Sequence, residues 1–124
     1  MKSDIAFWQE MNHLVTTNSI VIDRPKGSSH PRYPEIIYPL DYGYLENTTA
    51  SDGDGIDVWV GSMKITEHSE RDELLTGILC TFDTLKRDAE IKFLIGCTKA
   101  DVELIQNFHN EMHILFIPNP MANL

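Results

Sequence analysis

Apolar residues in this chain of 124 residues fall into short runs, and glycine, proline or charged residues interrupt each run. Short apolar runs bounded by turn residues are typical of β-strands. The predicted strand segments are 19–22, 35–45, 58–60, 74–85, 89–97 and 112–117. Residues 3–17 and 98–109 instead repeat apolar side chains at helical spacing. We therefore expect an α+β, mainly β fold, a small mixed barrel forming one domain over residues 1–124, with a helix near each end.

Polar segments predict the connections between these elements. Residues 23–34 are dense in proline, glycine and serine, so we expect a loop there. Residues 46–57 and 64–73 are also polar. We expect a loop at 46–57 and an exposed connection at 64–73. Lys86 and Arg87 separate the two longest apolar runs, which favours a hairpin.

Charge and composition narrow the kinds of partner. The formal net charge is −9, which argues against nucleic acid, because affinity for a phosphate backbone depends on cationic contacts. Residues 1–5 lack the basic and then apolar pattern of a signal peptide, and the apolar runs are too short for a membrane helix. The expected location is the cytoplasm, where Cys80 and Cys97 are expected to be buried thiols.

The first group of residues that suggests chemistry is acidic. Asp52, Asp54 and Asp57 lie within six residues, and the intervening glycines let the chain turn sharply. Carboxylates brought close together repel one another unless a cation lies between them, and hard oxygen ligands suit Mg²⁺ or Mn²⁺. A solvated acidic turn is the alternative. A calcium-binding EF-hand is excluded, because Ile56 and Met63 stand where it needs ligands.

Two further groups carry charges at notable positions. Asp83 and Asp88 flank the predicted hairpin turn, and Lys92 lies on the same side of the strand as Asp88. Charges at a hairpin tip are usually solvated, which is the alternative here. The segment 23–32 combines cations with a Gly-Ser turn that suits phosphate oxygens, although an exposed basic loop has the same composition.

These segments together resemble the soluble family I inorganic pyrophosphatases. Tyr-Pro-Leu-Asp-Tyr-Gly-Tyr-Leu at 38–45, Thr48, and Asp-Gly-Asp-Gly-Ile-Asp at 52–57 are similar to the family signature at the same spacing. The segment 22–28 is similar to the family's Glu-Ile-Pro-Lys-Gly-Ser. The resemblance implies a five-stranded OB-like barrel with an N-terminal and a C-terminal helix. It also implies hydrolysis of pyrophosphate to phosphate with Mg²⁺, or Mn²⁺ in its place, in a homo-oligomer.

The resemblance also implies roles for individual residues. Asp54 is expected to be the general base near a water between metal ions. The expected metal ligands are Asp52, Asp57, Asp83 and Asp88. The residues expected to contact the substrate are Arg32, Tyr42, Lys92, Lys26 and Asp23, the last at the position of the family's glutamate.

Departures from the family pattern affect mainly the phosphate ligands. Gly55 replaces a proline, Asp41 replaces an asparagine, and Pro34 stands where the family has glutamate. The hairpin that carries a further arginine between Arg32 and Tyr38 is missing, as is a late Tyr-Lys pair. The alternatives are therefore a non-catalytic domain, or a hydrolase of another phosphoanhydride such as a nucleotide diphosphate. A nucleic-acid-binding OB fold ranks last because of the negative charge.

Overall fold

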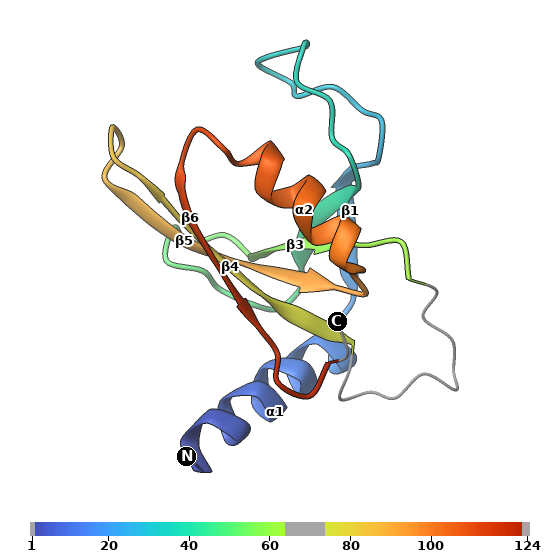
Figure 1. Ribbon diagram of the computed structural model, residues 1–124, viewed down its shortest axis with the longest axis vertical. Helices are drawn as coiled ribbons and strands as arrows, with labels where there is room; N and C mark the ends of the chain where they lie inside the picture. The colour runs from blue at the N-terminus through green and yellow to red at the C-terminus, as the bar shows by residue number, and fades with distance from the viewer. Residues whose placement is uncertain (1, 64–73, 123–124) are drawn as a thin grey trace.

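The computed structural model describes residues 2–63 and 74–122 (Figure 1). The predicted connection at 64–73 lies outside the described residues. In chain order the elements are α1 (Lys2–Thr17), β1 (Ile20–Arg24), β2 (Asp41–Leu45), β3 (Ile56–Val60), β4 (Leu75–Asp83), β5 (Asp88–Ile95), α2 (Lys99–Phe108) and β6 (His113–Pro118).

The strands form one six-stranded sheet in the order β1-β2-β3-β5-β4-β6. Neighbouring strands are antiparallel except β3 and β5, which are parallel. The predicted mainly β fold with a helix near each end is confirmed. The six predicted strand segments correspond to the six strands, one more than the five that the resemblance implies, and within the described residues β1 and β6 are the two outer strands of an open sheet.

Each face of the sheet carries its own hydrophobic core, because successive strand residues point to opposite faces. On one face, Trp8 and Val15 of α1 pack with Val58 and Phe93. On the other face, Val102 and Ile105 of α2 join a cluster around the fully buried Trp59. The sheet therefore has an α1 face and an α2 face, and each strand residue belongs to one of them.

Several strand boundaries differ from the prediction; among them, β3 begins at Ile56, so the predicted loop 46–57 ends two residues earlier than expected. β1 extends through Arg24, with a register shift between Ile22 and Arg24, so the predicted loop begins two residues later. β2 begins only at Asp41, so residues 35–40 are not part of the strand. Pro39 explains this difference, because a proline has no N–H for a strand ladder.

The second helix begins as the sequence predicts. The Thr98 side chain accepts from the Asp101 N–H, and the Asp101 side chain accepts from the Thr98 N–H, which forms a capping box. Asp101 also accepts from the backbone and hydroxyl of Ser62, so one carboxylate ties the helix to the end of β3. These hydrogen bonds outweigh burial and lower the pKa of Asp101.

The lengths of the helices and the burial of the two cysteines test two further predictions. None of the described helices is both long and apolar enough to span a bilayer. Both cysteines are free thiols. Cys97 is buried, as predicted, and burial raises the pKa of its thiol to about 12. The prediction was wrong for Cys80, which is only half-buried.

Candidate functional site

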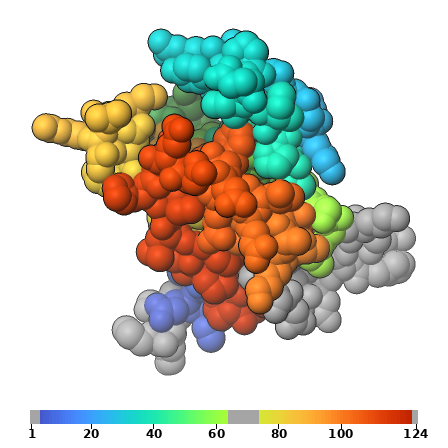
Figure 2. Space-filling model, turned by 45° about the horizontal axis from the view of Figure 1, so that its top comes forward, coloured from blue at the N-terminus to red at the C-terminus, as the bar shows by residue number. Residues whose placement is uncertain are grey.

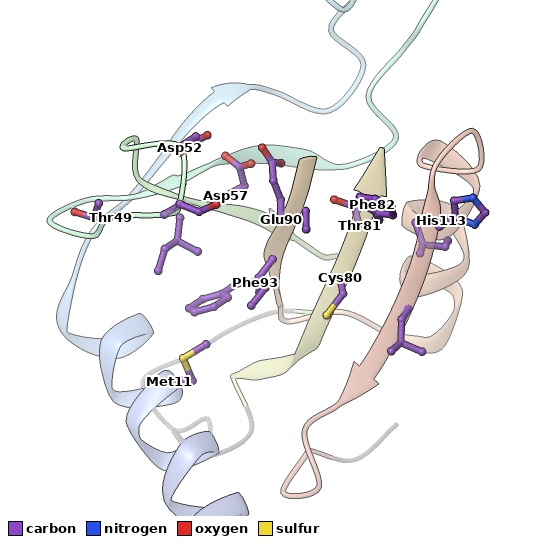
Figure 3. Close-up of a pocket in the computed structure, with 17 residues that line it drawn as sticks. Met11, Thr49, Asp52, Asp57, Cys80, Thr81, Phe82, Glu90, Phe93 and His113 are labelled. Carbon is purple, nitrogen blue, oxygen red and sulfur yellow. The ribbon is translucent and has the colours of Figure 1, made fainter. Parts of the chain in front are cut away.

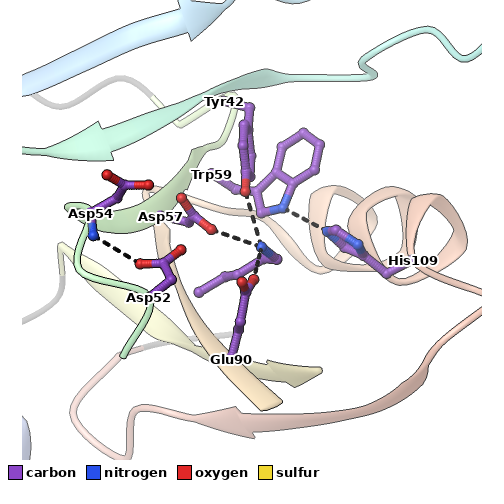
Figure 4. A network of polar contacts seen from close by, with 8 residues as sticks. Tyr42, Asp52, Asp54, Asp57, Trp59, Glu90 and His109 are labelled. Atoms are coloured by element: carbon purple, nitrogen blue, oxygen red, sulfur yellow. Dashed lines mark hydrogen bonds and ion pairs between the residues drawn. The ribbon is translucent and has the colours of Figure 1, made fainter. Parts of the chain in front are cut away.

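The centre of the candidate site is the ammonium group of Lys92, which donates to three oxygens (Figure 4). Its Nζ lies 2.9 Å from Asp57 Oδ2, 3.0 Å from Tyr42 Oη and 3.1 Å from Glu90 Oε2. The Lys92 side chain is only 5% exposed. A buried lysine is rarely stable without such partners, so this cluster is a specific arrangement of charges.

Strand pairing brings these residues together from distant parts of the sequence. Val58 of β3 is paired with Phe93 of β5, which sets the preceding residues Asp57 and Lys92 side by side. Tyr42 of β2 is the partner of Trp59 on the other side of β3. Because Val58 and Phe93 belong to the α1 face, Asp57 and Lys92 point to the α2 face.

Ionisation states in the cluster follow from burial and charge. Burial alone would lower the pKa of Lys92, but the adjacent Tyr42 and Asp57 outweigh it, so the pKa is raised and the ammonium stays charged. Burial raises the pKa of Tyr42, and Lys92 only partly offsets this, so the phenol stays neutral. Lys92 is thus a permanent cation between two carboxylates.

The acidic loop lies beside this cluster. The Asp54 backbone N–H donates to Asp52 Oδ1 at 3.0 Å, and the Ile56 N–H donates to the Thr48 hydroxyl at 2.9 Å, which fixes the turn into β3. Asp52 and Asp54 are exposed. The tight turn predicted from the glycines is present, with Gly53 at a φ of +89°.

One hollow of about 690 Å³ is lined mostly by apolar residues of β4, β5 and β6, and three acidic residues, Asp52, Asp57 and Glu90, lie at its border. We call this space the apolar hollow. Its lining residues are Met11, Thr49–Asp52, Ile56, Asp57, Cys80–Phe82, Ala89–Ile91, Phe93 and His113–Leu115. Figure 3 shows the carboxylates of Asp52, Asp57 and Glu90 along one rim, on the side away from Met11.

The other predicted acidic pair lies elsewhere. Asp83 and Asp88 are paired with each other at the end of the β4–β5 hairpin, whose tip protrudes in Figure 2. Asp83 Oδ1 accepts from the N–H groups of Leu85 and Lys86, so it stabilises the turn. Asp88 precedes Lys92 by four residues, a distance of about 13 Å along a strand. The structure therefore does not bring this pair to the Lys92 cluster, contrary to the expected convergence.

Glu90 occupies the position that was expected for Asp88. It lies two residues before Lys92, on the same face of β5, and contacts its ammonium. Asp88, Glu90 and Lys92 are each two residues apart and therefore share one face of the strand. This spacing is the sequence signal from which Glu90 could have been identified. Sequence reasoning missed it because the family spacing drew attention to the two aspartates.

The predicted phosphate ligands Asp23, Lys26 and Arg32, which precede Tyr42 in the chain, lie apart from the Lys92 cluster. Arg24 is the strand partner of Tyr42, so Asp23 lies one strand away from the cluster. Lys26 and Arg32 are exposed in the loop between β1 and β2, which extends beyond the sheet in Figure 1. The Lys26 backbone N–H donates to Asp41 Oδ1 at 2.8 Å, which gives the unusual Asp41 a structural role.

A histidine without a predicted role supports the site from the α2 face. Trp59 Nε1 donates to Nε2 of His109 at 3.2 Å, and both side chains are buried. The Tyr42 ring contacts Trp59 edge to face, with centroids 4.7 Å apart. The aromatic core thereby fixes the position of the phenol that Lys92 contacts.

Comparisons with known proteins point to one family. The family model described as inorganic pyrophosphatase matches residues 10–115. No curated protein sequence matches the chain. Among solved structures, an inorganic pyrophosphatase from Coxiella burnetii has 14% identity and a TM-score of 0.49, covering 80% of this chain and 82% of that one. An inorganic pyrophosphatase from Thermus thermophilus has 20% identity and a TM-score of 0.45, covering 79% and 78%.

Proposed function

Because this chain belongs to the inorganic pyrophosphatase family, we propose that it hydrolyses pyrophosphate to phosphate with Mg²⁺, or with Mn²⁺ in its place. The observation that carries this proposal is the contact of Lys92 with Asp57, Glu90 and Tyr42 inside the matched region. The free thiols Cys80 and Cys97 are consistent with a reducing compartment, and we include the cytoplasm in the proposal.

The side chains at this site fit a divalent cation in their chemistry. Carboxylate oxygens are the ligands that Mg²⁺ prefers. Asp57 and Glu90 already hold a positive charge between them, because the Lys92 ammonium contacts both. Within the described residues, no three acidic, histidine or cysteine side chains are gathered closely enough to hold a metal ion. We therefore propose that Asp52, on the exposed loop, moves toward Asp57 and Glu90 to complete the site.

Each side chain then has a part in the reaction. Bound Mg²⁺ supplies positive charge that stabilises the transition state and makes water a better nucleophile. Asp54 accepts the proton of the water that attacks one phosphorus atom. The bridging P–O bond breaks, and the second phosphate leaves. Lys92 and Tyr42 donate hydrogen bonds to phosphate oxygens, which are strongest where the donor is charged.

Phosphate release from pyrophosphate, measured with and without Mg²⁺, tests this function. The wild type is expected to turn over many times with Mg²⁺. Asp54→Asn keeps the size of the side chain but cannot accept a proton, so its kcat is expected to fall by about 100-fold or more. A wild type that releases no phosphate would favour the non-catalytic alternative.

A matched pair of variants tests the ligand assignment. Glu90→Gln is expected to raise the Mg²⁺ concentration for half-maximal activity by at least about tenfold, because it removes a charged ligand. Asp88→Asn, two residues away on the same strand face, is expected to leave that concentration unchanged. The reverse result would restore Asp88 as the ligand.

A further inference from the structure

The proposed reaction uses only the acidic border of the apolar hollow and leaves its apolar walls without a role. Cys80 of β4 is the strand partner of both Ile91 and Leu115, so these three side chains lie side by side on the α1 face. Ile91 is 47% exposed and Leu115 is 60% exposed, although both line the hollow. Large apolar side chains that stay exposed in one concave region mark an interaction site.

The size of the hollow suits a small molecule. Its volume is about 690 Å³, and sites for small molecules typically measure roughly 300–1,000 Å³ and have mostly apolar walls with few polar groups. The walls come from α1, from the loop before β3, and from strands β3, β4, β5 and β6 (Figure 3). A ligand in the hollow therefore contacts several elements of the fold at once.

The charges at the border of the hollow select the polar group of such a ligand. Asp52, Asp57 and Glu90 lie along one rim (Figure 3). The residues that line the hollow in the described part of the chain include no lysine or arginine. Lys92 contacts Asp57 and Glu90, so three carboxylates face one ammonium and the rim keeps an excess of negative charge. The rim therefore repels an anionic group and attracts a cationic one.

We propose that the apolar hollow binds a small amphiphile with an aliphatic tail and an ammonium head. The tail lies against Cys80, Ile91 and Leu115, and the head lies at the rim beside Asp52, whose side chain is exposed. Transfer of the tail from water is favourable, and the head stays hydrated at the rim. The net charge of −9 attracts this cation from a distance.

Such a ligand also acts on the proposed reaction. Its head and Mg²⁺ are attracted to the same carboxylates, so binding of one weakens binding of the other. The amphiphile is therefore an inhibitor that raises the Mg²⁺ concentration needed for activity. This consequence rests on the proposed function, whereas binding of the amphiphile in the hollow does not.

Titration calorimetry of the full chain with decylammonium, without Mg²⁺ and below the concentration at which micelles form, tests the binding. One decylammonium is expected to bind per chain, at least tenfold more tightly than decanoate, which has a similar tail and the opposite charge. Shortening the tail to octylammonium is expected to weaken binding by about fourfold per methylene. A wild type that binds no decylammonium, or that binds decanoate more tightly, would overturn the proposal.

A matched pair of variants tests the location. Ile91→Lys places a cation inside the hollow and is expected to weaken decylammonium binding at least tenfold and to strengthen decanoate binding. The control is Ile117→Lys, because Ile117 is 38% exposed on the same face but does not line the hollow. It is expected to bind both probes as the wild type does. An equal loss of decylammonium binding in both variants would mean non-specific binding and would also overturn the proposal.

Phosphate release from pyrophosphate measures the competition with Mg²⁺. Decylammonium is expected to raise the Mg²⁺ concentration for half-maximal activity at least threefold in the wild type but not in Ile91→Lys. An unchanged Mg²⁺ requirement would contradict the position of the head at the rim. A wild type without turnover would refute the proposed function and not the ligand site, which the calorimetry tests by itself.

Discussion

At the scale of single residues, the ammonium of Lys92 occupies the place between two carboxylates that a metal ion would share. Lys92→Met removes this cation but keeps much of the apolar volume. We expect Asp57 and Glu90 to bind Mg²⁺ more tightly in the variant, because their built-in counter-charge is gone. We also expect kcat to fall by about 100-fold, since a charged donor to phosphate is lost.

Thermal unfolding with increasing Mg²⁺ measures the binding half of this prediction without turnover. A ligand that binds the folded state raises the melting temperature. The rise per Mg²⁺ increment is expected to be larger in Lys92→Met than in the wild type. A smaller rise would mean that Lys92 supports the metal ligands instead of competing with the ion.

At the scale of elements, the position of Tyr42 depends on the close approach of β1 and β2. Gly43 follows Tyr42, and a Cβ at Gly43 would overlap the backbone carbonyl of Val21. We expect Gly43→Ala to lower the free energy of unfolding by about 1–3 kcal/mol, because β1 must move away. Urea unfolding followed by tryptophan fluorescence measures this loss.

Gly53→Ala is a useful comparison, since no atom lies within 4 Å of its Cβ position and only its backbone conformation is strained. Its loss of unfolding free energy is expected to be smaller than that of Gly43→Ala. If Gly43→Ala left stability unchanged, the two strands would have to be less tightly joined than described.

At the scale of the whole molecule, local patterns in the sequence predicted most elements but not their arrangement. The helices and the β4–β5 hairpin follow from periodicity and turn residues. The parallel pairing of β3 with β5 sets Asp57 beside Lys92, and no local pattern encodes a contact between strands so far apart. The motif therefore identified Tyr42, Asp57 and Lys92, while Glu90 became evident only from the strand register.

The stability of the fold should also depend on pH through His109. Burial, with a smaller contribution from Lys92, lowers the pKa of His109 from 6.5 to about 3. The imidazole is thus neutral in the folded chain, where Nε2 accepts from Trp59. Between pH 6.5 and 3 the unfolded chain binds more protons, so acidification favours unfolding by at most about 1.4 kcal/mol per pH unit.

The variant His109→Gln isolates this effect, because glutamine does not titrate. The contributions of all other titrating groups to the pH dependence cancel when the two proteins are compared. We therefore expect the wild type's free energy of unfolding, relative to His109→Gln, to be constant above pH 6.5 and to fall between pH 6.5 and 4 in urea titrations. Parallel pH profiles for the two proteins would show that His109 has the same pKa in the folded and unfolded chain.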